Sequence, residues 1–518
     1  MRPDPALSRA CRYAERTAGR CGEWIEAHTV ACWTVFTLLY SVTSIAQAIR
    51  RPLWFDEIVT FHVCRLPDLA SLWDAVKQGA DANPLLFHLI SRGAFAAFGE
   101  NPLAGRATAI AGFWLMSLCL YLFVRRRCGP LWAWVAAILP LVTDAVYYST
   151  EARPYGLVLG FSALALLAWQ GTKEYGFRRM SLAGLALALA AAVSCHFYAV
   201  FLAVGIGVGE LRWTVERKKF DWWSWAALCV GLSPLALMTP VIGAATGYAG
   251  DRWSKATLAA VTDSYRNALS GTIKPAVAVL LLVAAIWAIH AERTGNPVET
   301  QRNRLPGHEV AAALGLALWP LSAGLFSLLV SGIYVWRYSV PLVIGICVLV
   351  AFSLYEKLGR DKALVTLIVA LLFVYPFALR VSSLRQPVSS PDWAWISTAA
   401  ENREAPVAVA SAIVYLEADY YATAELRPRL WSVVDPRKAL RYTGNRSAEV
   451  GVLNLRPWAR VQVQHADAFL RRYRSFYLLE SPLNPGWLLQ ELLASGAQVS
   501  VRRVHGDNLL CWVTQRPQ

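Results

Sequence analysis

Long apolar segments alternate with short basic loops over the first 380 residues of the chain. The first apolar segment, at 29–49, carries no charge and has about the 20 residues that a helix needs to cross a bilayer. Similar segments bring the expected number of spans to about 11, at 104–124, 131–149, 155–172, 181–195, 197–212, 223–243, 274–291, 309–332, 338–355 and 363–379. This pattern predicts a polytopic α-helical membrane protein.

The segment between the first two spans, at 50–103, is too polar and too often interrupted to be a span itself. Residues 61–77 place apolar side chains at helical spacing on one face, which predicts a helix lying in the membrane interface. Residues 85–98 are apolar but short, and they contain His88 and Arg92. We therefore expect two interfacial helices in this first outer loop.

From residue 380 onward, prolines separate short apolar runs, a pattern typical of a soluble domain. The runs at 407–414, 476–479, 499–504 and 509–513 predict strands. Residues 485–495 predict a helix, with Asn484 as its cap and Gly496 as its stop. The expected organisation is a cytoplasmic segment at 1–28, a transmembrane domain at 29–379, and a soluble α/β domain at 380–518.

The charge pattern supports a membrane protein and predicts its orientation. Only 16% of residues are charged, whereas a soluble protein carries about 25%. The net charge of +15 does not indicate nucleic acid, because Lys and Arg concentrate in loops between spans, as cytoplasmic loops require. With the N-terminus in the cytoplasm, the inner loops are basic at 125–127, 173–179, 212–219, 293–304 and 357–362. Asp56 and the region after residue 379 are then expected outside the cytoplasmic (inner) membrane. The spans themselves are expected to contact the lipids of this membrane.

Polar residues from separate loops are expected on this outer face. Asp56 and Glu57 follow the first span, where an acid pair is costly to hold and rarely accidental. Arg106 and Asp144 are expected to pair with each other for structural reasons. The remaining candidates for a common site are Asp81, Asn83, Glu151, Arg153, His196, Tyr198 and Arg337. The ten cysteines show neither a CxxC pair nor zinc spacing, so we expect buried thiols and no zinc site.

Several local motifs resemble those of GT-C class glycosyltransferases, in particular bacterial relatives of protein O-mannosyltransferases and lipid A aminoarabinose transferases. The resemblance covers most of residues 30–380 and is carried by Trp54-Phe55-Asp56-Glu57, Asp81-Ala82-Asn83-Pro84-Leu85-Leu86-Phe87, Tyr147-Tyr148-Ser149-Thr150-Glu151-Ala152-Arg153-Pro154-Tyr155, His196-Phe197-Tyr198 and Arg337-Tyr338-Ser339-Val340-Pro341. Where this family often has His-Pro-Pro-Leu-Tyr, the chain has Asn83-Pro84-Leu85-Leu86-Phe87. This departure puts in doubt a metal role or an acceptor contact at position 83.

The resemblance implies an inverting transfer of a sugar from a polyprenyl-phosphate carrier to a hydroxyl acceptor outside the cytoplasmic membrane. The acceptor would be a protein, a lipid or an envelope glycan. Such a reaction needs a carboxylate as general base, for which Asp56 is the candidate, and fixed cations for the phosphate, for which Arg153 and Arg337 are the candidates. Glu57, Asp81, Asn83, Glu151, His196 and Tyr198 are expected to orient the site or to contact the acceptor. Arginines alone can stabilise a monophosphate leaving group, so the chemistry requires no cofactor, and a divalent metal is left open.

Simpler structural roles stay open for these residues. Asp56 could be an interfacial acid that pairs with Arg50 or Arg51, and Arg337 could extend toward the interface from the end of a span. Glu151 and Arg153 could form a local salt bridge, and His196 could be a hydrogen-bonded structural residue. A transporter or flippase of lipid-linked sugars is the alternative function, but it would spread polar residues across the membrane depth, whereas here they gather on one side.

Overall fold

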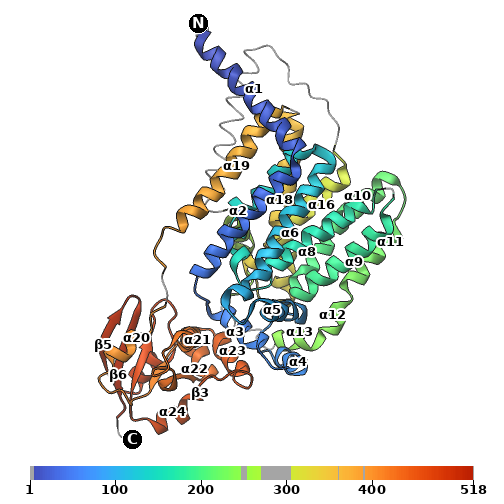
Figure 1. Ribbon diagram of the computed structural model, residues 1–518. Coiled ribbons are helices and arrows are strands. Elements are labelled where there is room, and N and C mark those ends of the chain that lie inside the picture. The colour runs from blue at the N-terminus through green and yellow to red at the C-terminus, as the bar shows by residue number, and fades with distance from the viewer. Residues whose placement is uncertain are drawn as a thin grey trace.

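The computed structural model describes residues 5–174, 176–246, 254–269, 305–359, 361–388 and 391–516. These residues form a bundle of helices with a small sheet at one end, and the first helix lies at the opposite end (Figure 1). The bundle contains α1 (Pro5–Ala27), α2 (Thr29–Arg50), α6 (Pro102–Cys128), α7 (Pro130–Ile138), α8 (Tyr155–Gly171), α9 (Arg178–Cys195), α10 (Phe201–Arg217), α11 (Trp222–Leu232), α12 (Pro234–Leu237), α13 (Thr239–Thr246), α14 (Leu258–Ala268), α16 (Gly307–Ala317), α17 (Trp319–Phe326), α18 (Leu342–Leu358) and α19 (Lys362–Ser383).

Every expected span within the described residues falls on helical segments, and the one at 274–291 lies outside them. Among the described residues, five helices are long and apolar enough to cross a membrane, or up to seven if each bent pair is one span. One pair bends by 77° where η1 (Leu139–Val142) meets η2 (Asp144–Thr150), and the other bends by 47° between α16 and α17. Pro140 and Pro320 lie near these bends, and a proline removes a backbone donor from a helix. The expected helical architecture with several long apolar helices is therefore confirmed, whereas the crossing of a membrane and the number of 11 spans stay predictions.

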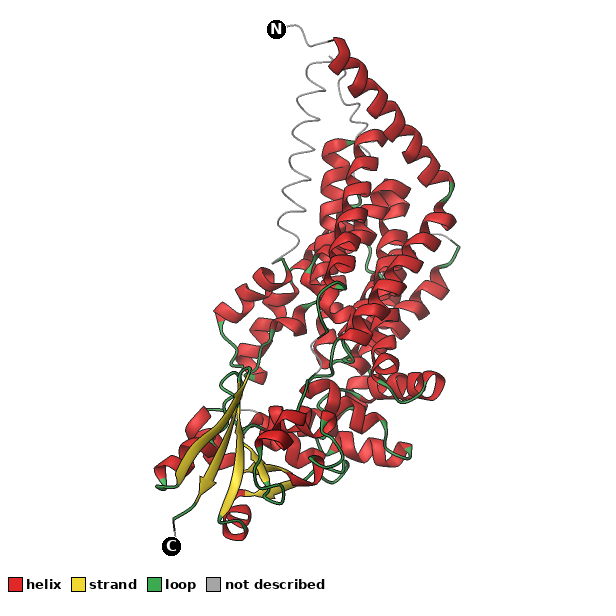
Figure 2. Ribbon diagram, turned by 60° about the vertical axis from the view of Figure 1, so that its left-hand side comes forward, coloured by secondary structure: helices red, strands yellow, loops and turns green. Residues whose placement is uncertain are grey.

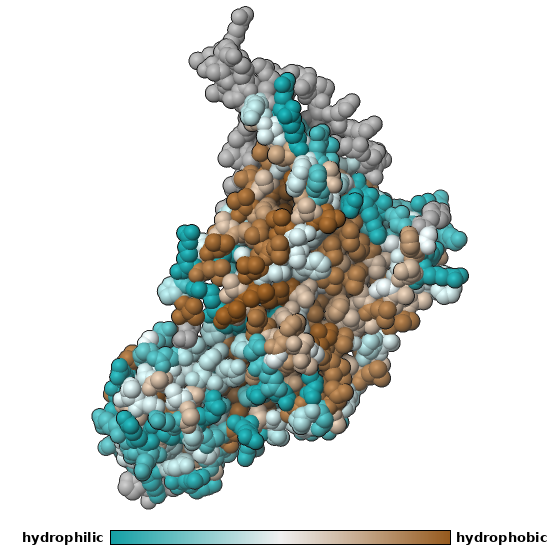
Figure 3. All heavy atoms as spheres, viewed as in Figure 1, coloured by the Kyte–Doolittle hydropathy of each residue, from teal (hydrophilic) through white to brown (hydrophobic). Residues whose placement is uncertain are grey.

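The surface of the bundle is apolar around its middle, whereas the end that carries the sheet is largely polar (Figure 3). The exposed apolar side chains include Val35, Leu38, Val42 and Ile49 on α2, and Leu367 and Val374 on α19. Soluble monomers rarely expose continuous apolar surfaces of this kind, which mark contact with a membrane or a partner.

Glycines let α6 and α8 pack closely in the centre of the bundle. A Cβ atom at Gly112 would collide with the backbone of Gly156, and one at Gly160 would lie 2.5 Å from the carbonyl oxygen of Gly112. Small residues at such crossings allow helix backbones to approach each other in membrane proteins. The close crossing fixes the start of α8, and with it the loop at 151–154, beside α6.

The segment at 50–103, called the first outer loop after its expected position, contains α3 (Phe55–Cys64), α4 (Leu69–Lys77) and α5 (Leu85–Phe98). The expected helix at 85–98 is present, but the single helix expected at 61–77 is wrong. The chain turns after Cys64, and Asp68 starts a new helix by accepting a hydrogen bond from the backbone N–H of Ser71 at 2.7 Å. Pro67 lies at this turn. Because proline has no backbone N–H, it interrupts the hydrogen bonding of a continuous helix and favours the break between α3 and α4.

The C-terminal region forms a six-stranded sheet in the order β3-β2-β1-β4-β6-β5. Its strands are β1 (Val407–Val409), β2 (Leu430–Val434), β3 (Val463–His465), β4 (Ser475–Glu480), β5 (Gln498–His505) and β6 (Asn508–Thr514). The first four are parallel, and β6 and β5 add an antiparallel edge. Helices accompany them: α20 (Ala394–Ala399), α21 (Ala412–Tyr421), α22 (Pro436–Thr443), α23 (Ser447–Leu455), α24 (Ala466–Arg472) and α25 (Leu488–Ala494).

One face of this sheet shares a hydrophobic core with the first outer loop. Val407 and Val409 point to the face that packs with α21, α23 and the apolar side chains of α3 and α4, whereas Ala408 points to the opposite face. The Phe61 and Tyr420 rings lie 5.5 Å apart, and the backbone N–H of Leu53 donates to the Tyr421 hydroxyl at 2.6 Å. The sheet therefore sits at the end of the bundle where α3, α4 and α5 lie (Figure 1), and Figure 2 shows its strands together at that end.

The expected secondary structure of this region needs three corrections. The strand expected at 407–414 ends at Val409, and α21 begins at Ala412. Strands β2 and β3 were not expected. The helix expected at 485–495 is α25, which follows Trp487 instead of Asn484, and Gly496 ends it with a φ of +76°.

Candidate active site

The start of α3 presents two neighbouring carboxylates to different surroundings. The carboxylate of Glu57 accepts a hydrogen bond from the backbone N–H of Trp54 at 3.4 Å, which caps the first turn. Consecutive side chains on a helix point about 100° apart, so the two acids cannot face the same way. Asp56 lines a cavity, whereas Glu57 is fully buried.

Glu57 is sealed inside the protein by a two-point ion pair with Arg106. The Arg106 Nε and Nη2 atoms lie 2.9 and 2.6 Å from its carboxylate oxygens. The backbone N–H of Ala152 also donates to Glu57, at 2.6 Å, and so ties the loop before α8 to α3. Arg106 therefore pairs with Glu57 and not with Asp144, as the sequence had suggested. This placement favours the orienting role of Glu57 over contact with an acceptor.

Asp56 lies beside the guanidinium groups of Arg153 and Arg337, which line the same cavity. Its Oδ2 atom lies 3.6 Å from Nη2 of Arg337 and 3.9 Å from Nη2 of Arg153, and its side chain is 22% exposed. The alternative pairing with Arg51 does not occur, because Arg51 contacts Glu57 instead, at 3.5 Å. A partly exposed carboxylate beside two cations can exchange its partners when a ligand enters.

Asp81 is a buried hub that fixes Arg153. It accepts hydrogen bonds from the Thr60 hydroxyl at 2.9 Å, from the Asn83 amide at 2.6 Å and from Nη1 of Arg153 at 3.1 Å. Nε2 of His88 lies 3.2 Å from the same carboxylate. Burial by itself raises the pKa of Asp81, but the Arg153 charge and the His88 and Thr60 hydrogen bonds hold it below its usual range. Asp81 is therefore an anion that positions Arg153, and the hydrogen bond from the Asn83 amide helps to hold Asp81 in place.

His88 and Trp54 also contact the site residues, although neither was among the residues expected to form the site. Nδ1 of His88 lies 3.2 Å from the carbonyl oxygen of Pro84, one helical turn earlier. A polar residue in the otherwise apolar segment 85–98 was the available signal. Trp54 lies beside the acid pair and could have been recognised by that position.

Glu151 lies behind Trp54. Its Oε1 atom accepts a hydrogen bond from Nε1 of Trp54 at 2.9 Å, and its buried Oε2 atom has no hydrogen-bond partner within the described part of the chain. Burial, together with the charge of nearby Glu57, raises the pKa of Glu151 to about 7. The salt bridge between Glu151 and Arg153 that the sequence left open is not formed, since Arg153 contacts Asp56 and Asp81.

His196 and Tyr198 pack against the back of the site. The His196 ring lies 5.0 Å from the ring of Tyr338, and burial together with the charges of Arg153 and Arg337 lowers the pKa of His196 to about 3. The Tyr198 hydroxyl donates to the carbonyl oxygen of Ile333 at 2.8 Å and joins Ser327 and Ser331. Neither side chain lines the cavity, so their surroundings indicate support for the loop that carries Arg337.

The cavity has a volume of about 650 Å³ and lies between the outer loop and the C-terminal sheet. Asp56, Asp81, Arg153 and Arg337 line it from the bundle side, together with Trp54 and Tyr338. Glu57, Asn83, Glu151, His196 and Tyr198 are not among the lining residues. Among the described residues, no group of three His, Cys, Asp or Glu side chains is placed to hold a metal ion.

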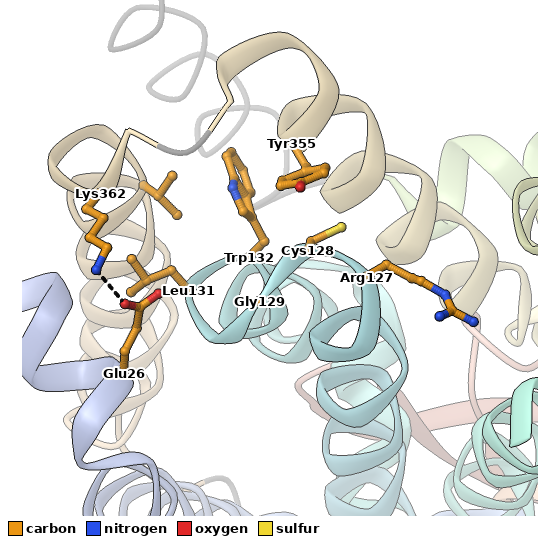
Figure 4. A pocket seen from close by; sticks show the side chains of 9 residues that line it. Glu26, Arg127, Cys128, Gly129, Leu131, Trp132, Tyr355 and Lys362 are labelled. Carbon is orange, nitrogen blue, oxygen red and sulfur yellow. Dashed lines mark ion pairs between the residues drawn. The ribbon is translucent and has the colours of Figure 1, made fainter. Parts of the chain in front are cut away.

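The basic loops that the structure describes lie at the opposite end of the bundle from the sheet (Figure 1). Arg127 pairs there with Glu309 and Glu174, at 2.6 and 2.7 Å, and Lys173 pairs with Glu210. A second cavity at this end, of about 300 Å³, is lined by Trp132 and by an ion pair of 2.9 Å between Lys362 and Glu26 (Figure 4). It contains none of the expected site residues.

Comparisons with known proteins address the fold. No protein-family model matches the sequence, and no curated protein matches it. The crystal structure of ArnT from Cupriavidus metallidurans in the apo state is 12% identical, with a TM-score of 0.56 over 95% of this chain and 100% of that chain. The structure of ArnT from the same organism bound to undecaprenyl phosphate is 12% identical, with a TM-score of 0.51 over 94% and 99%. The chain thus shares the fold of ArnT, and the resemblance to GT-C glycosyltransferases indicated by its motifs is confirmed at the level of the fold.

Proposed function

We propose that the chain is an inverting glycosyltransferase that moves a sugar from a polyprenyl-phosphate carrier to an acceptor hydroxyl. The observation that carries this proposal is the Asp56 carboxylate, which lines the cavity 3.6 Å from Arg337 and 3.9 Å from Arg153. A base beside two fixed cations is what transfer from a phosphate leaving group requires. Undecaprenyl phosphate bound to ArnT, whose fold this chain shares, supports a polyprenyl-phosphate carrier.

The reaction is a single displacement at the anomeric carbon. The acceptor oxygen forms a bond to this carbon, and the bond from the carbon to the phosphate oxygen breaks, with its electron pair leaving on the phosphate. The acceptor proton passes to Asp56. Arg153 and Arg337 stabilise the phosphate charge, since each guanidinium offers paired donors to phosphate oxygens. Attack opposite the leaving group inverts the anomeric centre.

Donor binding also prepares the base. Without a donor, Asp56 is the counter-ion of both arginines. A donor phosphate takes over that role, which releases the carboxylate to accept a proton. Asp81 keeps Arg153 in place during this exchange, because it contacts Nη1 at 3.1 Å, whereas Asp56 lies near Nη2. The two arginines supply charge that a divalent ion would otherwise supply, so we expect transfer to continue in the presence of a chelator, and loss of transfer with the chelator would indicate a divalent metal.

The site is proposed to face the outside of the cytoplasmic membrane. The grouping of the basic loops at the opposite end of the bundle supports this orientation under the positive-inside rule. The C-terminal domain at 380–518 would then also be extracytoplasmic.

The Asp56→Asn variant tests the proposal. The full-length protein in nanodiscs would be given undecaprenyl-phosphate hexoses and pentoses with an envelope extract, and release of labelled sugar from the carrier would be measured with and without a chelator. We expect Asp56→Asn to lose activity by about a hundredfold or more, because a general base contributes at least that much. The matched variant Asp507→Asn, in the exposed turn between β5 and β6, keeps it. Undiminished transfer by Asp56→Asn overturns the proposal, and carrier transport across vesicles without a transfer product favours a flippase.

A further inference from the structure

The second wall of the cavity comes from the C-terminal sheet. Residues 410–413, which follow β1, and residues 483–487, which follow β4, line the same cavity as Asp56. The starts of α21 and α23 contribute Ser411 and Ser447. The cavity is therefore closed by the carboxyl ends of two neighbouring parallel strands.

These two strands are the point at which the strand order reverses. The chain runs from β1 outward to β2 and β3, and then returns to place β4 on the other side of β1. In open α/β sheets, the crevice outside the carboxyl ends at such a point is where ligands bind. Gly486 brings the two loops together, since a Cβ atom there would collide with the carbonyl of Ala410.

The two walls differ in charge. The bundle wall carries Arg153, Arg337 and Asp56, whereas the described lining residues of the C-terminal wall include no Lys, Arg or His. Its one acid, Glu449, is engaged: the backbone N–H of Asp435 donates to one carboxylate oxygen at 2.7 Å, and Nε1 of Trp487 donates to the other. The C-terminal wall thus offers neutral groups to a ligand.

Several of these neutral groups are hydrogen-bonding side chains. Ser411 precedes the first turn of α21, and its side chain makes no capping hydrogen bond to that turn. Ser411, Ala412 and Ile413 all line the cavity, and the backbone N–H groups in the first turn of a helix have no partner within the helix. The Asn484 side chain is exposed on the same wall. Within the described part of the chain, neither Ser411 nor Asn484 uses its side chain in an internal hydrogen bond. Small residues of α23 that line the same cavity, such as Ala448 and Gly451, leave room for a ligand.

We propose that this C-terminal wall is the acceptor site and that it binds an uncharged, hydroxyl-rich acceptor of the neutral carbohydrate class. The inference rests on the proposed function, in which the donor phosphate occupies the arginines of the bundle wall. The attacking hydroxyl then approaches the anomeric carbon from the other side, where the C-terminal wall lies. A second anion there would meet no cation, and burying an unpaired charge is costly, whereas hydroxyl groups find donors and acceptors.

Binding of saccharides to the full-length protein in nanodiscs loaded with undecaprenyl phosphate tests this inference. Saturation-transfer NMR would compare neutral di- and trisaccharides with their monophosphorylated counterparts and with an acidic peptide. We expect the neutral saccharides to bind most tightly. The Gly451→Leu variant places a side chain into the cavity, because Gly451 lines it and a Cβ atom at this helical position meets only Phe55, at 3.9 Å. It should weaken saccharide binding at least tenfold, and Ser411→Ala should weaken it about three- to tenfold, as expected for one hydrogen bond.

Ala494→Leu is the matched control, since it adds the same side chain to an exposed position of α25 away from the cavity. It should leave saccharide binding unchanged. The inference is overturned if no neutral saccharide binds, if Gly451→Leu and Ser411→Ala both bind it as the wild type does, or if the phosphorylated saccharides or the peptide bind more tightly. Undecaprenyl phosphate binding is measured separately in each variant. Its absence in the wild type counts against the proposed function, whereas its retention in Gly451→Leu with loss of saccharide binding supports the acceptor site.

Discussion

Arg106 holds Glu57 through two parallel hydrogen bonds of 2.9 and 2.6 Å, and both side chains are completely buried. This pair joins α6 to the first turn of α3, and so fixes the direction in which Asp56 points. The carboxylate next to the proposed base is therefore part of the scaffold.

The Glu57→Gln variant should lower the free energy of unfolding by about 3–5 kcal/mol, because it leaves the Arg106 charge buried without its counter-ion. Thermal unfolding in nanodiscs measures the effect. Glu100→Gln is the control, since the ion pair between Glu100 and Arg65 is half exposed and such pairs contribute little. Equal shifts in Tm for the two variants would contradict the prediction.

Arg337 contributes more than a positive charge. A guanidinium presents paired donors to a phosphate, whereas an ammonium acts as a point charge. We expect Arg337→Lys to lower kcat/KM for an undecaprenyl-phosphate sugar by about tenfold or more. Steady-state kinetics would show this loss, and Arg502→Lys, on the exposed surface of β5, should behave as the wild type. A wild-type kcat/KM in Arg337→Lys would mean that the paired donors are not used.

Glu151 makes stability depend on pH. Its pKa is about 7 in the folded protein and 4.5 in its ordinary range, so between these values the folded state retains a proton that the unfolded chain releases. The contribution of Glu151 to stability is therefore present below pH 4.5 and is lost as the pH rises toward 7. The Tm of the wild type minus the Tm of Glu151→Gln should fall progressively between pH 4.5 and 7. Above pH 7 this difference should be constant.

Glu401→Gln provides the control for this pH dependence, because Glu401 is exposed. Its Tm difference from the wild type should stay flat over the same window. A flat difference for Glu151→Gln as well would show that Glu151 is ionised in the folded protein.

Hydropathy located the helices because an apolar segment of this length is a local signal. The bends near Pro140 and Pro320 make the number of spans depend on how the bent helices are counted. Each bent pair is long and apolar enough to cross a membrane only when its two helices are taken together. Strands β2 and β3 are short segments that pair in parallel with distant neighbours, and this pairing leaves little trace in the local sequence.

The sequence could nominate the polar residues of the site but not their partners. Arg106 meets Glu57 across 49 residues, and Arg153 meets Asp81 across 72. Nothing in the spacing distinguishes this pairing from one between Arg106 and Asp144. The C-terminal wall of the cavity was likewise hidden, because its glycine, serine and asparagine residues carry no charge pattern.

The hydrophobic core that unites the outer loop with the C-terminal sheet has a consequence for engineering. Exchanging residues 391–516 for the corresponding region of another protein would leave apolar side chains such as Phe61 and Leu72 against surfaces that do not fit them. Chimeric proteins made at the end of α19 should therefore aggregate unless the segment from Leu53 to Ala104 is exchanged with it. When genes of this fold recombine, the segment from Leu53 to Ala104 and residues 391–516 therefore have to come from the same parent, although most of the bundle separates them in the sequence.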